Sequence, residues 1–138
     1  MKIIDEAIEL AYALFPIAYK EKERGVYRTF HWSFGYKRSR LIGIGQAEPA
    51  HINGRALTIA KKFGIHRYIK HSYLHSEIDL ISRLWGRVYL DNSIRLINIR
   101  LNAKGELRNS KPCVNCQKVL DAIGISKIFY SVNGGMNE

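Results

Sequence analysis

Apolar side chains recur every three or four residues at the start of the chain. The resulting stripe consists of Ile4, Ala7, Ile8, Ala11 and Phe15. The acidic side chains of this segment fall outside the stripe, so the spacing predicts an amphipathic helix over residues 3–15. We expect this helix to end at Pro16 or soon after it, because proline disrupts the interior of a helix. Residues 20–25 are expected to form a charged turn.

The period of the pattern changes to two after residue 26. Small or polar residues alternate with the aromatic residues Phe30, Trp32, Phe34 and Tyr36. Such alternation is typical of a strand buried on one face only. Residues 37–40 are a basic turn, and the apolar residues 41–45 predict a second, fully buried strand. The two strands would form a β-hairpin with a basic tip.

Helices and strands are expected to alternate in the remainder of the chain. Residues 65–74 are ambiguous. We expect a loop at 46–54, a short helix at 56–63, a helix at 76–85 stopped by Gly86, a strand at 93–101, a polar loop at 102–111, a helix at 113–123 closed by Gly124 and a final strand at 127–132. This order predicts a three-layer α/β/α fold, in which helices cover both faces of a mixed sheet of four to five strands.

The composition is that of one globular domain. A chain of 138 residues, with 46% hydrophobic and 25% charged content, has enough material for one substantial core. No apolar run is long enough to span a membrane, and the acidic residues of the first helix argue against a signal peptide. We therefore expect a cytoplasmic or intravirion location and no membrane partner. The net charge of +10 favours anionic partners over a neutral free base.

Three residues that are distant in the sequence have the chemistry of a zinc site. His75 begins the triplet His-Ser-Glu, and Cys113 and Cys116 belong to the run Pro-Cys-Val-Asn-Cys. One imidazole and two thiolates supply three zinc ligands and leave a fourth position for water, as in catalytic rather than structural sites. Glu77 is then placed to carry the proton of that water.

The predicted helices give this set of residues a favourable setting. His75 falls just before one helix and Cys113 opens another, so both are expected at helix N-termini. The positive end of the helix dipole stabilises a thiolate or carboxylate there. Pro112 is compatible with this position, because a proline at the start of a helix loses no hydrogen bond.

The pattern His-x-Glu followed by Pro-Cys-x-x-Cys is that of zinc-dependent nucleobase deaminases. Over roughly residues 26–134, the chain resembles the cytidine and deoxycytidylate deaminase superfamily, and it looks like the small members met in viruses and phages. Residues 1–25 would be an N-terminal helix and turn added to this core. The resemblance implies hydrolysis of the cytosine amine of a nucleotide or nucleoside, which gives uracil and ammonia. It also implies that His75, Cys113 and Cys116 bind Zn²⁺, that Glu77 is the proton shuttle, and that the chain forms a homo-oligomer.

The resemblance further implies contacts with the base. Ser76 stands between the histidine and the glutamate, where relatives commonly have alanine. Many relatives have a Gly-x-Asn turn after the second strand, whereas this chain has no asparagine at that spacing; Gln46 or Asn53 would replace it. The candidate substrate-binding residues are Ser76, Gln46, Asn53, Ser110, Lys111 and Pro112.

The end of the chain departs from the family pattern. Relatives usually add a helix and a fifth strand after the position of Val132, whereas this chain stops at Glu138. We therefore expect the corresponding edge of the sheet to be bare, covered by a partner or capped by the N-terminal helix.

Two alternatives concern the metal ligands. A structural zinc site would need a fourth protein ligand, for which His71 is a candidate one helical turn before His75. A thioredoxin-like redox motif would place Cys-x-x-Cys at the first helix of a βαβ unit, whereas only one helix and one strand follow it here. We favour the open zinc site over both. His31, His51, His66 and His71 are individually expected to be surface or packing residues.

Two further alternatives concern the substrate. The chain could edit single-stranded DNA or RNA, at cytosine or adenosine, with aromatic and basic hairpin residues as its platform. We favour a plain sheet for that hairpin. It could also be an inactive zinc-stabilised module that binds nucleic acid or protein, although the intact Glu77 argues against this. The platform residues would be Tyr27, Arg28, Trp32, Tyr36, Lys37, Arg38 and Arg40.

Overall fold

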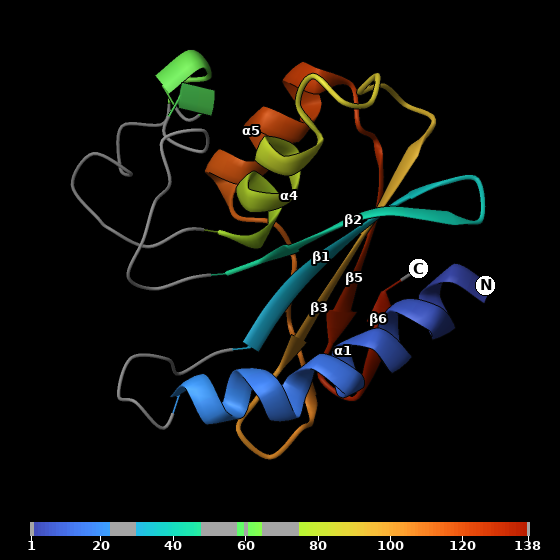
Figure 1. Cartoon of the computed structure of the whole chain (residues 1–138), viewed down its shortest axis with the longest axis vertical. Coiled ribbons are helices and arrows are strands. Elements are labelled where there is room, and N and C mark those ends of the chain that lie inside the picture. Colours follow the sequence, from blue (N-terminus) through green and yellow to red (C-terminus); the bar gives the residue numbers. More distant parts are fainter. Residues whose placement is uncertain (1, 23–29, 48–57, 60, 65–74, 138) are drawn as a thin grey trace.

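The computed structural model describes residues 2–22, 30–47, 58–59, 61–64 and 75–137 (Figure 1). The elements, in chain order, are α1 (Lys2–Lys22), β1 (Phe30–Lys37), β2 (Arg40–Gln46), α4 (Ser76–Leu84), β3 (Ile94–Leu101), β4 (Leu107–Arg108), α5 (Val114–Ile123), β5 (Lys127–Val132) and β6 (Gly135–Asn137). Residues 58, 59, 61 and 62 are also helical, where a short helix is expected.

Within the described residues, six strands form one mixed sheet. Five of them are hydrogen-bonded side by side in the order β2-β1-β3-β5-β6, and the sixth strand, β4, pairs with β3. The pairing of β3 with β5 is parallel, and the other pairings are antiparallel. Helix α1 lies on one face of the sheet, and α4 and α5 lie on the other (Figure 1). The predicted three-layer α/β/α fold with a mixed sheet is confirmed.

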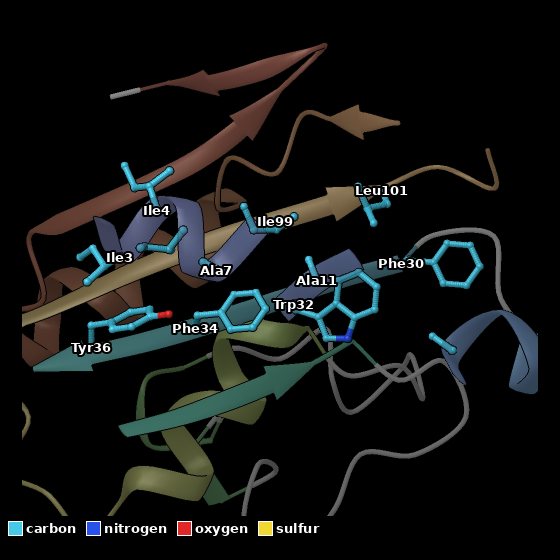
Figure 2. Close-up of a cluster of buried hydrophobic side chains, with 12 residues drawn as sticks. Ile3, Ile4, Ala7, Ala11, Phe30, Trp32, Phe34, Tyr36, Ile99 and Leu101 are labelled. Atoms are coloured by element: carbon cyan, nitrogen blue, oxygen red, sulfur yellow. The ribbon is translucent and has the colours of Figure 1, made fainter. Parts of the chain in front are cut away.

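Strand β1 is buried on both faces, not on one as expected. Its aromatic residues pack against α1 in a core that Figure 2 shows. On the opposite face, Ser33 is fully buried and Gly35 lies against Leu80 of α4. Small residues therefore alternate with aromatic ones because helix α4 covers this face of β1, and the face is not exposed to water. The expectation for β2 is wrong in the opposite sense, since β2 is an edge strand and most of its residues are only half-buried.

Helix α1 continues through Pro16 to Lys22, so the prediction that proline would end it near residue 16 is wrong. The turns beyond the proline have their own contacts with the sheet. Ala18 is buried, and the Tyr19 ring stacks on the Phe30 ring at a centroid distance of 6.1 Å. These contacts offset the backbone hydrogen bond that proline cannot donate.

The aromatic residues of β1 do not form an exposed platform. Trp32 is 1% exposed and Tyr36 is fully buried beneath α1, where its hydroxyl donates to Glu6 at 2.9 Å. Neither ring offers a face on which a nucleic-acid base could stack. Tyr27 and Arg28 lie outside the described residues. Among the helices that the structure describes, none is long and apolar enough to cross a membrane.

Two short strands were not anticipated from the sequence. Strand β4 lies in the expected polar loop and pairs with the end of β3. Strand β6 follows a two-residue turn with Gly134 at φ 79° and pairs with β5. The edge of the sheet beyond β5 is therefore covered by the chain's own next segment, which is none of the three expected arrangements.

The main chain of helix α4 packs directly against strand β2 of the sheet. A Cβ atom built on Gly45 of β2 would lie 2.2 Å from the carbonyl oxygen of Ser76 and 2.5 Å from the amide nitrogen of Leu80. Both are main-chain atoms of α4, which cannot give way as a flexible side chain can. Only glycine therefore allows β2 and α4 to approach so closely, and this contact fixes where the N-terminus of α4 lies.

We predict that Gly45→Ala lowers the free energy of unfolding by at least about 2 kcal/mol, because the added methyl group forces α4 away from the sheet. Chemical denaturation measures this loss. Gly35→Ala is the matched control, since the nearest atoms to its Cβ would belong to the side chains of Leu80, at 3.4 Å, and Ile42, at 3.6 Å, which are ordinary contact distances. Equal losses in the two variants would contradict the close approach.

Candidate metal centre

His75 and Cys113 lie at the N-termini of the two helices on the same face of the sheet. His75 is the residue before α4, and its carbonyl oxygen accepts the first helical hydrogen bond, from Asp79, at 3.0 Å. Cys113 is the residue before α5, and its sulfur accepts a hydrogen bond from the Cys116 backbone N–H at 3.4 Å. The sulfur therefore caps the helix. Both predicted positions are confirmed.

The three predicted metal ligands lie together. Their donor atoms are all within 4.8 Å of one another. The Nδ1 atom of His75 is 3.6 Å from the Cys113 sulfur and 3.4 Å from the Cys116 sulfur. Standard zinc bond lengths and tetrahedral angles require an N···S separation of about 3.6 Å, so the observed spacing fits one zinc ion. Both cysteines are free of disulfide bonds.

The surroundings of Cys113 favour its thiolate. Its pKa is lowered from the ordinary value of 9.0 to about 3. The hydrogen bond from the Cys116 side chain is the largest cause, and His75 and the Cys116 N–H act in the same direction, while desolvation opposes them. A thiolate is the form of cysteine that binds metals, so this sulfur is prepared for a cation.

Glu77 is buried at the start of α4, with 1% of its surface exposed. Its carboxylate accepts a hydrogen bond from the Ser76 hydroxyl at 2.9 Å. The Nε2 atom of His31 lies 4.0 Å from the same carboxylate oxygen. The Glu77 carboxylate, two residues after the ligand His75, thus has one neighbour from its own helix and one from the sheet.

His31 is a site residue that the sequence did not reveal, since we expected a surface or packing residue. Burial is the largest influence on its pKa, which is lowered; Glu77 and Cys113 oppose this shift, and His75 and Arg100 reinforce it. The charges of the Glu77 carboxylate and of two metal ligands, His75 and Cys113, therefore act on the pKa of this imidazole. Its Nε2 atom is buried, and no described residue forms a hydrogen bond with it. Only the pairing of β1 with β3, which sets His31 opposite Arg100, brings it here.

A chain of buried polar side chains lies behind Glu77. The Ser76 and Ser33 hydroxyl oxygens are 2.8 Å apart, and Ser33 donates to Oδ1 of Asn98 at 2.6 Å. The Asn98 amide nitrogen in turn donates to the Ser110 carbonyl oxygen at 3.1 Å. All four residues are at most 2% exposed. The chain joins α4, β1, β3 and the loop before α5.

The predicted substrate-binding residues fall into different environments. The Ser110 hydroxyl donates to the Asn98 carbonyl oxygen at 2.8 Å and accepts from the Ser131 N–H at 2.8 Å, so it is used inside the fold. Lys111 is exposed and Pro112 is buried. The backbone N–H of Gln46 donates to the Asp79 carboxylate at 2.9 Å, which ties β2 to α4. Asn53 and the alternative ligand His71 lie outside the described residues.

Two hollows on the surface lie away from this centre. One, of about 390 Å³, is bordered by Trp85, Tyr89 and Ile123 near the C-terminal ends of α4 and α5. The other, of about 330 Å³, lies between Ile42 of β2 and Arg83 of α4. Neither is lined by a metal ligand or by Glu77, so neither contributes to the chemistry of the metal centre.

Comparison of the chain with protein-family models, curated proteins and solved structures finds no match. A function can therefore be proposed only from the geometry and chemistry of the metal centre and from the sequence motifs.

We predict that the purified protein binds one zinc ion per chain, and that His75→Ala or Cys116→Ser abolishes stoichiometric binding, because each removes one of three donors. Elemental analysis and competition with a chromogenic chelator measure this. His31→Ala is the matched control, since it removes a neighbouring imidazole outside the donor cluster and should retain the ion. Zinc retained by all of these variants would show that the metal binds elsewhere.

We also predict that Cys113 in the metal-free protein remains a thiolate well below neutral pH. Because its folded-state pKa of about 3 is below the ordinary 9.0, ionisation stabilises the fold fully above pH 9, and this stabilisation declines as pH falls toward 3. Thiolate ultraviolet absorbance, followed as pH is lowered, measures the titration. Cys113→Ser should remove the thiolate signal that persists at mildly acidic pH; a signal that disappears near the ordinary thiol pKa in the wild type would refute the prediction.

Proposed function

We propose that this chain is a zinc-dependent deaminase that hydrolyses the exocyclic amine of cytosine in a nucleotide or nucleoside. The observation that carries the proposal is the combination of three converging donors with a buried carboxylate two residues after the histidine. The resemblance to the cytidine and deoxycytidylate deaminase superfamily rests on these same residues.

His75, Cys113 and Cys116 would hold the zinc ion. When bound, zinc lowers the pKa of a coordinated water to about 7, so that a nucleophile exists near neutral pH. Within the described residues, the cluster provides three protein donors, which is the number that catalytic zinc sites use. This supports an open site over a closed structural one.

Glu77 would move the protons of the reaction. Its carboxylate accepts a proton from the attacking water and delivers it to the ring nitrogen beside the reacting carbon. A carbon–oxygen bond forms, and Glu77 then takes the remaining proton from the added hydroxyl and passes it to the amine, so that the carbon–nitrogen bond breaks and ammonia leaves. Burial suits this role, because a shuttle shielded from bulk water exchanges its proton with the substrate instead of the solvent.

The charge of the chain supports a phosphate-bearing substrate. The net charge of +10 attracts anions from solution. Lys111 is exposed in the loop just before Cys113, so a cation lies close in sequence to the metal ligands. We therefore favour a nucleotide over a nucleoside or a free base.

We predict that the zinc-loaded protein converts at least one of cytidine, dCMP, dCTP or a cytosine-bearing single strand to its uracil product. Glu77→Gln should lower kcat by about 10²- to 10⁴-fold, because it removes the proton shuttle and keeps the side-chain shape. Chromatography of the product and an ammonia assay measure the reaction.

Glu106→Gln is the matched control, since it makes the same change at an exposed glutamate in the loop before β4. Its kcat should equal that of the wild type. Absence of uracil product from every substrate, with zinc bound and the fold intact, would rule out the proposed activity.

A further inference from the structure

We propose that Ser33 and Asn98 are positioning residues for the reaction, acting through Ser76 on the carboxylate of Glu77. The inference rests on the proposed function and extends it to two sheet residues that no sequence motif marks. It is drawn from the buried hydrogen-bonded chain behind the metal centre, which runs from Asn98 through Ser33 and Ser76 to Glu77.

The Asn98 end of this chain has a defined direction. The Asn98 amide nitrogen donates to the Ser110 carbonyl oxygen, so its Oδ1 atom faces Ser33. A carbonyl oxygen can only accept, and Ser33 therefore donates to it. The Ser33 oxygen is thereby held 2.8 Å from the Ser76 oxygen.

The other end of the chain acts on Glu77. Ser76 has one hydroxyl proton and two partners, so it donates either to Glu77 or to Ser33. With the carboxylate ionised, one of the two close contacts of the Ser76 oxygen is therefore not a hydrogen bond, because Ser33 gives its own proton to Asn98. When Glu77 carries the proton of the attacking water, it donates to Ser76, Ser76 donates to Ser33 and Ser33 donates to Asn98, so that the hydrogen-bonded chain from the carboxyl group to the sheet is continuous.

The supporting residues lie on two interior strands of the sheet. Ser33 and Asn98 are opposite each other on β1 and β3, the paired strands at the centre of the sheet, and both are fully buried. Buried polar groups cost free energy unless their hydrogen bonds are made, so displacement of one member disturbs the others. A carboxylate that must reach both water and a ring nitrogen benefits from such a fixed support.

The test is a double-mutant cycle in the zinc-loaded protein. Ser33→Ala should lower kcat by about 10- to 100-fold, the range typical of lost orienting groups, while zinc remains bound. KM should change by no more than about twofold, because the substrate itself is not contacted. In a Ser76→Ala background, the same substitution should change kcat by no more than about twofold, because the connection is already broken.

Ser82→Ala is the matched control, since Ser82 is also buried on α4 but its hydroxyl donates to the Asp79 carbonyl oxygen of its own helix. Its kcat should stay at the wild-type value. If Ser33→Ala does not fold, Ser33→Cys replaces it, because it keeps a side chain of similar size with a weaker donor. An unchanged kcat in the Ser33 variant, or an equal loss in both backgrounds, would overturn the inference.

A crystal structure of the metal-free variant gives a readout that does not depend on activity. We expect the Glu77 carboxylate of Ser33→Ala to leave its wild-type position or to occupy several conformers, while the rest of α4 is unchanged. A Glu77 side chain that keeps its place would overturn the inference. An inactive wild-type protein whose Glu77 moves in the variant would instead defeat the proposed function alone.

Discussion

The backbone of α4 touches the sheet at Gly45, and the arrangement of the centre depends on this contact. A helix usually stands off a sheet by the length of its side chains, but here a single Cβ on β2 would overlap the helix main chain. Most residues of α4 are buried, and Ser76 and Glu77 at its start are at most 1% exposed. The close approach also brings a serine of the helix within hydrogen-bond distance of a serine of β1.

Two helix N-termini then meet at one point above the sheet. Each supplies a metal donor from the residue that precedes the helix, and the third donor lies in the first turn of α5. The helix dipoles favour negative charge there, as does the network of hydrogen bonds around the Cys113 sulfur. The centre is therefore prepared for a cation by its backbone geometry as well as by its side chains.

The two faces of the sheet have different chemistry. The α1 face is a core of aliphatic and aromatic side chains (Figure 2). On the other face, an apolar cluster beneath α4 and α5 adjoins a row of polar groups that includes Ser33 and Asn98. A purely structural core would have no need of these groups, whose burial is costly unless each finds a partner. Their position directly behind Glu77 gives that cost a functional explanation.

The sequence by itself determined the three-layer class of fold, the limits of most elements, and the three donors with their acidic neighbour. These features depend on periodicity and on side-chain chemistry within short segments. Only the tertiary structure decided that Pro16 is accommodated, that β1 is interior while β2 is an edge, that His31 lies beside Glu77, and that Ser33 connects Ser76 to Asn98. These contacts join residues up to 65 positions apart. They depend on how the layers pack against one another, and the pattern of residues within a short segment does not determine that packing.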